Sequence, residues 1–341
     1  FHYVLCLSEA KGMNIIMNNS LLYYSVGALL YCPANRKTIV DSITRQRFGT
    51  KYSLALCLED TIRDDCVAEA EHILTNSLCQ LAKRTEQETF YLPKIFVRVR
   101  NARQIGRLYK AFGESIRLVT GFILPKFSLE NADTYIQEIL RANELASQPL
   151  YTMPIFESPS IIDLRYRTEI LYTLKEKLDQ IEDKVLNIRV GGNDLCHAFG
   201  YRRHDDESIH QIRPIADIFS DIITVYGRDY VVSGPVWEYY HSSNWERGLY
   251  HEIADDKLCG FIGKTVIYPT QISIVNEAYK VSEHDYQDAA AILNWDKSSH
   301  SLVAGSVSKE RMNEYKTHSN WALRTLLTAE YFGVKKAQPD K

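Results

Sequence analysis

The chain has 341 residues, of which 45% are hydrophobic and 24% are charged, a balance typical of a globular protein with a sizeable core. Forty basic side chains against 43 acidic ones give a net charge of −3, which indicates neither a nucleic-acid partner nor an anionic membrane. The longest apolar run, residues 21–32, is too short to span a bilayer.

The seven cysteines are odd in number and form no Cys-x-x-Cys pair, so we expect neither a zinc site nor a disulfide framework. A reducing, cytoplasmic location fits this usage best. The sequence begins with Phe1, and Met13 is a candidate natural start, with the residues before it a leader or a fragment boundary. We treat residues 1–24 as an N-terminal tail.

Eight short apolar runs follow in chain order, each rich in Val, Ile, Leu and aromatic residues, as expected of strands buried on both faces. They are 26–33, 53–60, 94–100, 121–127, 151–158, 185–194, 229–236 and 260–269. Between them, apolar residues recur every three to four positions at 63–84, 128–146 and 167–181, which predicts amphipathic helices.

This alternation predicts an α/β protein, a (β/α)₈ TIM barrel over residues 25–280. A doubly wound open sheet is the alternative, although no strand is followed by a Gly-x-Gly-x-x-Gly turn. Residues 271–296 are expected to form the last barrel helix, a break near Ser282 and a further helix. Residues 281–341 would then be a C-terminal helical extension, serving as a lid or oligomerisation segment, with one helix at 320–332.

Charged side chains gather where the predicted strands end, which in such barrels is where active sites lie. Carboxylates follow strands two, five and six, and cations follow strands three, four and eight, although a buried strand should bring few charges. They are Glu59, Asp60, Glu157 and Asp194, and Arg98, Lys126 and Lys264. The segment VGGND, residues 190–194, has two interpretations: a tight turn with a capping Asn or Asp, or a carboxylate held at the barrel mouth.

The residue types at this rim favour a particular chemistry. Several carboxylates without His or Cys ligands suit Mg²⁺ rather than zinc. A nearby arginine suits capture of a substrate carboxylate, and together with the metal it would hold a 2-oxo acid and polarise its carbonyl. These groups could make or break a carbon–carbon bond through an enolate.

Seven motifs along the chain also fall in the order seen in a known family. They are LYCPANR, LCLEDTI, VRVRN, ILPK, IFESP, VGGNDL and GFIGKTVIYPTQI. Over residues 28–295 the chain resembles the citrate lyase beta subunit, citramalyl-CoA lyase and malyl-CoA lyase of the HpcH/HpaI aldolase superfamily. It is most similar to a divergent branch of TIM-barrel C–C bond lyases found beside tellurium-resistance genes.

The resemblance implies roles for single residues. It makes Glu157 and Asp194 the Mg²⁺ ligands and Arg98 the clamp on the oxo-acid carboxylate. Glu59 and Asp60 would hold metal-bound waters, and Arg36 and Lys126 would line the pocket with positive charge. Two alternatives stay open: Arg36 caps a helix or pairs with Glu59, and Lys126 belongs to a structural ion pair.

The sequence also departs from the family pattern. Ile267-Tyr268-Pro269 stands where relatives usually have Ile-His-Pro, and Lys309 stands where the acyl-CoA enzymes carry a catalytic Asp on the C-terminal lid. Glu310 or Glu314 would replace that Asp, or the chemistry would differ. His318 and Trp321 are expected to pack the lid helix.

The prediction is a Mg²⁺-dependent carbon–carbon lyase that cleaves a hydroxy acid, or a hydroxyacyl thioester of CoA or an acyl carrier, to an oxo acid and an enolate-derived product. One alternative is a partner-dependent or non-catalytic subunit, and another is a CoA-independent oxo-acid aldolase. By resemblance we also expect a homo-oligomer, a trimer or hexamer.

Overall fold

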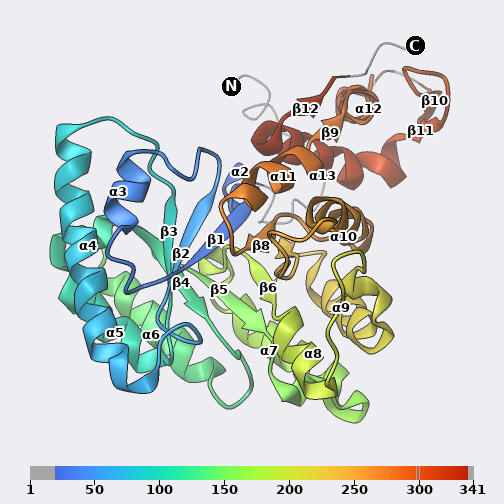
Figure 1. Cartoon of the computed structure of the whole chain (residues 1–341). Helices are drawn as coiled ribbons and strands as arrows, with labels where there is room; N and C mark the ends of the chain where they lie inside the picture. Colours follow the sequence, from blue (N-terminus) through green and yellow to red (C-terminus); the bar gives the residue numbers. More distant parts are fainter. Residues whose placement is uncertain (1–19, 297, 299, 337–341) are drawn as a thin grey trace.

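The computed structural model describes residues 20–296, 298 and 300–336 (Figure 1), so most of the predicted N-terminal tail lies outside the described residues. Eight parallel strands form one sheet. They are β1 (Ala28–Pro33), β2 (Ser53–Cys57), β3 (Lys94–Arg98), β4 (Val119–Leu124), β5 (Tyr151–Phe156), β6 (Ile188–Val190), β7 (Val232–Ser233) and β8 (Lys264–Val266).

The sheet closes on itself. Each strand pairs with the next in sequence, and β1 also pairs with β8, with Ala28 opposite Lys264. Between β7 and β8 the backbone N–H of Gly234 donates to the carbonyl of Gly263 at 3.0 Å, and that of Ile262 donates to Val232 at 2.8 Å. The predicted (β/α)₈ barrel is therefore confirmed, and the open-sheet alternative is wrong.

One short helix precedes β1, and the other helices of the barrel follow its strands and cover its outside (Figure 1). They are α2 (Leu21–Tyr24), α3 (Ile39–Thr44), α4 (Val67–Gln87), α5 (Ala102–Phe112), α6 (Ala132–Leu145), α7 (Leu164–Asp179), α8 (Gly192–Phe199), α9 (Arg213–Tyr226), α10 (Trp245–Cys259) and α11 (Thr270–Ala278). Polar caps set two of the starts: the side chain of Asn101 accepts from Gln104 N–H before α5, and that of Asp163 accepts from Arg165 N–H before α7.

The strand residues divide between two hydrophobic cores because side chains alternate along a strand. One set, which includes Leu29, Phe96 and Met153, packs in a small cluster inside the barrel. The other set, which includes Leu30 and Val97, packs in the larger cluster that contains the buried faces of the helices. The residues that continue the inner set toward the strand ends are the polar ones, so the alternation itself delivers polar side chains to the mouth.

The C-terminal elements lie together beside the barrel (Figure 1). They are β9 (Val281–Ser282), α12 (Glu283–Leu293), β10 (Val303–Gly305), β11 (Met312–Glu314), α13 (Tyr315–Phe332) and β12 (Val334–Lys335). Ser282, where the sequence suggested a break, caps α12 through a hydrogen bond from Asp285 N–H. The antiparallel β10–β11 hairpin was not predicted.

Two further observations concern the part of the chain that the structure describes. None of its helices has the length and apolar character needed to cross a membrane. Its six cysteines are all free thiols, and three of them, Cys32, Cys57 and Cys196, are buried.

Candidate active site

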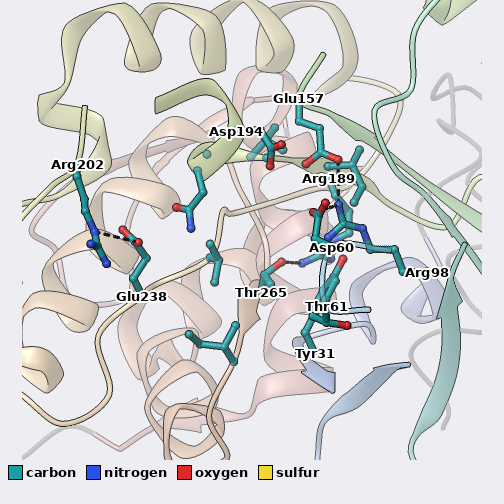
Figure 2. Close-up of a pocket in the computed structure, with 17 residues that line it drawn as sticks. Tyr31, Asp60, Thr61, Arg98, Glu157, Arg189, Asp194, Arg202, Glu238 and Thr265 are labelled. Carbon is teal, nitrogen blue, oxygen red and sulfur yellow. Dashed lines mark hydrogen bonds and ion pairs between the residues drawn. The ribbon is translucent and has the colours of Figure 1, made fainter. Parts of the chain in front are cut away.

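A cavity of about 460 Å³ opens at the carboxyl ends of the strands (Figure 2). Its lining comes from the inward-facing positions of several strands and from the loops that follow them. The lining includes Tyr31, Asp60, Arg98, Glu157, Arg189, Gly191, Gly192, Asp194, Arg202, Glu238 and Thr265.

Arg98, the last residue of β3, lies at the centre of a cluster of carboxylates. Its Nη2 is 2.7 Å from Glu59 Oε2, 2.9 Å from Asp60 Oδ2 and 3.2 Å from Glu157 Oε1. The guanidinium also lies 5.9 Å from the centre of the Tyr31 ring. Its Nε is buried and has no hydrogen-bond partner among the described residues. The three carboxylates therefore hold the guanidinium in place and leave one buried donor unused.

Lys126, in the loop after β4, touches the same cluster in two ways. Its Nζ lies 2.5 Å from Glu59 Oε1 and 3.2 Å from Asp60 Oδ1. Its backbone N–H donates to Glu157 Oε1 at 3.0 Å. Lys126 has a left-handed backbone conformation, with φ of +49°, which a lysine adopts at some cost. This strained turn brings both the amide and the side chain of Lys126 to the carboxylates.

Glu157 follows β5 and is buried, with 4% of its surface exposed. Its carboxylate lies against the backbone of Gly191, where a Cβ atom would overlap the Glu157 side chain and come within 2.9 Å of its Cδ. Gly191 has an ordinary negative φ of −96°. The chain turns from β6 into α8 through this one residue, and the missing Cβ of Gly191 leaves space for Glu157.

Asp194 is the third residue of α8, whose N-cap is Gly191. Strand β6 ends at Val190, so the run predicted over 185–194 extends too far. The capping interpretation is also wrong, because no side chain caps α8. In Figure 2 the carboxylates of Asp194 and Glu157 face the same part of the cavity.

The pKa values follow from this crowding. Burial and the nearby Asp194 carboxylate raise the pKa of Glu157 to about 7, although Arg98 and Lys126 act to lower it. Burial also acts against the charged form of Arg98, but Tyr31, Glu157 and Glu59 outweigh it and raise its pKa. Arg98 therefore stays charged, whereas the charged form of Glu157 is destabilised because this carboxylate is buried beside that of Asp194.

Two of the basic side chains that we expected at the barrel mouth, Arg36 and Lys264, do not lie in the cavity. Arg36 does not line the cavity: its Nε donates to Thr38 Oγ1 at 3.3 Å, and its guanidinium stacks over Phe48 at 5.5 Å. It also makes no ion pair with Glu59. Lys264 begins β8 rather than ending it, and it points outward. Its Nζ is buried against α10, 3.0 Å from Glu252 and 2.6 Å from Asp256.

Among the described residues, the C-terminal segment contributes none to the cavity, whose lining extends from Tyr31 to Ile267. Lys309 lies exposed in the β10–β11 turn, with φ of +60°. His318 Nδ1 accepts from the backbone N–H of Glu314 at the start of α13, and Trp321 stacks with Arg311 at 5.1 Å. His318 and Trp321 have the packing roles that we expected.

Several lining residues were not predicted. Arg189 and Thr265 face the inside of the barrel from β6 and β8, and Tyr31 does so from β1. Glu238 lies 3.5 Å from Arg202, at the other side of the cavity (Figure 2). For Arg189 a signal existed: a lone arginine in the apolar run VLNIRV, at a position that alternates with the outward-facing Ile188 and Val190.

The donor set fits a magnesium ion that takes part of its coordination from substrate and water. Within the described residues, no group of three or more His, Cys, Asp or Glu side chains is arranged to hold a metal. Magnesium often uses only one or two protein carboxylates. Two carboxylates, those of Glu157 and Asp194, line the same part of the cavity, and the missing Cβ of Gly191 leaves room for that of Glu157.

Similar barrels are found among solved structures. A citrate lyase from Burkholderia xenovorans covers 92% of this chain and 94% of its own length, with 14% identity and a TM-score of 0.69. CitE from Mycobacterium tuberculosis, solved with magnesium, acetoacetate and coenzyme A, covers 90% and 99%, with 18% identity and a TM-score of 0.58. At these identities the likeness shows the fold. No curated protein matches the chain.

The family model described as C–C bond lyase of the TIM-barrel fold matches residues 20–334. The chain belongs to this family. It is therefore a carbon–carbon lyase, as the motifs predicted.

Proposed function

We propose that this chain is a Mg²⁺-dependent lyase that cleaves a hydroxy acid or hydroxyacyl thioester into an oxo acid and an enolate-derived product. The observation that carries the proposal is the position of Glu157, a buried carboxylate held between Arg98 and Asp194 in the cavity. The magnesium and acid complexes of M. tuberculosis CitE, a protein of the same fold, support it.

The charges of the site favour a divalent cation. Four carboxylates, Glu59, Asp60, Glu157 and Asp194, face two cations, Arg98 and Lys126, and one negative charge remains in excess when the deeper Arg189 is counted. A cation between Glu157 and Asp194 would relieve the repulsion that raises the pKa of Glu157. In this proposal Glu157 and Asp194 would hold the ion, and Glu59 and Asp60 would hold water beside it. When bound, the ion polarises the substrate carbonyl and offsets the charge of the enolate.

The residues of the chain itself bind and orient the substrate. In the cleavage direction the hydroxyl proton passes to a water molecule, the carbon–carbon bond breaks with its electron pair forming the enolate, and the hydroxyl carbon becomes the oxo carbon. The enolate then takes up a proton from solvent. Arg98, fixed by three carboxylates, is the donor for the oxo-acid carboxylate through nitrogen atoms such as the unpartnered Nε. Lys126 holds Glu59 and Asp60 beside it.

Substitution of Glu157 by Gln tests the proposal. It removes one ligand charge while keeping the shape, so Mg²⁺ affinity should fall by at least about 100-fold and turnover should be lost. Mg²⁺ binding is measured by calorimetry, and turnover by mass spectrometry with acetyl-CoA or propionyl-CoA and glyoxylate, pyruvate or oxaloacetate. Glu169→Gln, the same change on the exposed side of α7, is the control. Unchanged Mg²⁺ affinity and turnover in Glu157→Gln would contradict the proposal.

The same assay decides whether a thioester is used, which the presence of Lys309 in place of the family's lid aspartate brings into question. A condensed hydroxyacyl-CoA that disappears with EDTA identifies a thioester lyase and its oxo acid. Tight Mg²⁺ binding without such a product, with release of free pyruvate from a hydroxy oxo acid, identifies the CoA-independent aldolase. We propose an oligomer whose C-terminal segment forms the interface, which light scattering on the full chain tests.

A further inference from the structure

Arg189 lies inside the barrel, deeper than the carboxylate cluster. It is on β6, two residues before Gly191, and only 1% of its surface is exposed. Its Nη2 donates to Thr265 Oγ1 at 2.6 Å, an interaction drawn in Figure 2, and its Nη1 donates to Asn187 Oδ1 at 3.2 Å. Both acceptors are neutral oxygens, and the guanidinium lines the cavity.

The other buried arginines of the described chain all have a carboxylate partner. Arg98 pairs with three, Arg167 lies 2.9 Å from Asp221, and Arg203 lies 2.8 Å from Glu252. No carboxylate of the described residues forms an ion pair with Arg189. A buried charge without a counter-charge is costly, and such a cost is typical of positions that bind a ligand.

The other ionisable groups that face Arg189 do not balance its charge. They are the hydroxyls of Tyr31, from β1, and Tyr279, from the end of α11. Burial raises the pKa of Tyr31 to about 12, so this hydroxyl is neutral at physiological pH. The hydroxyl of Tyr279 donates to the carbonyl of Gly263 at 3.1 Å. Arginine stays charged even when burial lowers its pKa, so the positive charge persists.

We propose that Arg189 and Thr265 form an anion subsite at the floor of the cavity, which binds a second carboxylate of the substrate. The inference rests on the proposed function, in which the first carboxylate binds at Arg98. It makes Arg189 a specificity-determining residue that selects oxo acids with two carboxylates over those with one. Thr265 holds the guanidinium in place, so that less ordering is needed when the anion binds.

Oxaloacetate and pyruvate are a matched pair of probes, since they differ by one carboxylate. We measure the binding of each by calorimetry in saturating Mg²⁺, for the wild type, Arg189→Met and Arg189→Lys. Wild type should bind oxaloacetate more tightly than pyruvate. Arg189→Met should lose about 10- to 100-fold in oxaloacetate affinity, the value of a charge-assisted pair, and less than about threefold in pyruvate affinity. Arg189→Lys should fall between.

A second variant keeps the test valid if Arg189→Met does not fold, as judged by circular dichroism. Thr265→Val keeps the charge of Arg189 and the side-chain volume but removes the hydrogen-bond partner of Arg189 Nη2. It should weaken the binding of oxaloacetate, but not that of pyruvate, by a smaller factor than Arg189→Met does. Equal losses for both acids, or no loss for oxaloacetate, would overturn the subsite. A different result would reject the proposed function: both acids would bind without Mg²⁺, and the Glu157→Gln substitution would leave their binding unchanged.

Discussion

Substitution of Gly191 by Ala isolates the packing argument for the metal site. The added methyl group would overlap the Glu157 carboxylate and its Cβ, so rotation of the carboxylate alone cannot make room for it. Overpacking of this kind costs about 1–3 kcal/mol. If the cost falls on the position of Glu157, Mg²⁺ affinity should decrease by about 5- to 150-fold, because each 1.4 kcal/mol is a factor of ten.

Titration calorimetry with Mg²⁺ on the full chain measures this loss, and Gly192→Ala is a matched control. The methyl group added at Gly192 would meet Ile209 Cδ1 at 2.6 Å and Pro235 Cβ at 3.0 Å, away from Glu157. Gly192→Ala should therefore lower the thermal midpoint, by about 2–4 °C per kcal/mol, and keep its Mg²⁺ affinity. Wild-type Mg²⁺ affinity in Gly191→Ala would refute the reasoning.

Two further predictions concern a buried ion network that joins α10 to β8. His210 Nε2 lies 2.8 Å from Asp256; burial acts to lower its pKa, but hydrogen bonds with Asp256 and Cys259 outweigh this and raise it to about 9. The pKa of His210 in the folded protein therefore exceeds its unfolded value of about 6.5. The charged imidazole stabilises the folded protein fully below pH 6.5, and this stabilisation is lost as the pH rises through 9. Urea unfolding from pH 6 to 9.5 should show this decline and His210→Gln should flatten it; a parallel decline in the variant would contradict the assignment. Lys264→Met leaves Glu252 and Asp256 buried without it, and should lower the free energy of unfolding by about 3–5 kcal/mol; an effect no larger than that of Lys280→Met, which breaks the exposed pair with Glu277, would count against this.

The barrel was predictable because each strand is an apolar run and the runs are separated by helical periodicity. The last three strands are shorter than predicted, and the reason is physical. Apolar residues that follow a strand pack just as well in the first turn of a helix or in a loop, so hydrophobicity does not mark where pairing stops. Strand β6 ends at Val190, because the carbonyl of Gly191 already accepts from Leu195 N–H in the first turn of α8.

The mouth of the site was predictable for the same reason, since Glu59, Arg98 and Glu157 continue the inward-facing set at the strand ends or just beyond them. Lys264 was misplaced because β8 begins there, which turns its side chain outward and leaves Thr265 inside. Arg189 was missed because only the strand ends were considered. A charge within an apolar strand is also informative, because its burial requires either an ion pair, as at Lys264, or another polar partner, as at Arg189.

The glycine before β1 has a consequence for how the chain folds. Gly27, with φ of +59°, lies where a Cβ would collide with the ring of Tyr331 on α13, and α13 also contacts α2. Arg324 of the same helix donates to the carbonyls of Gly227 and Gly260, both at 3.1 Å. Contacts across about 300 residues close slowly, because a large loop entropy is lost before they form. On the ribosome the contacts of α13 with this end of the barrel can therefore form only after Arg324 and Tyr331 have been synthesised, about 300 residues after β1.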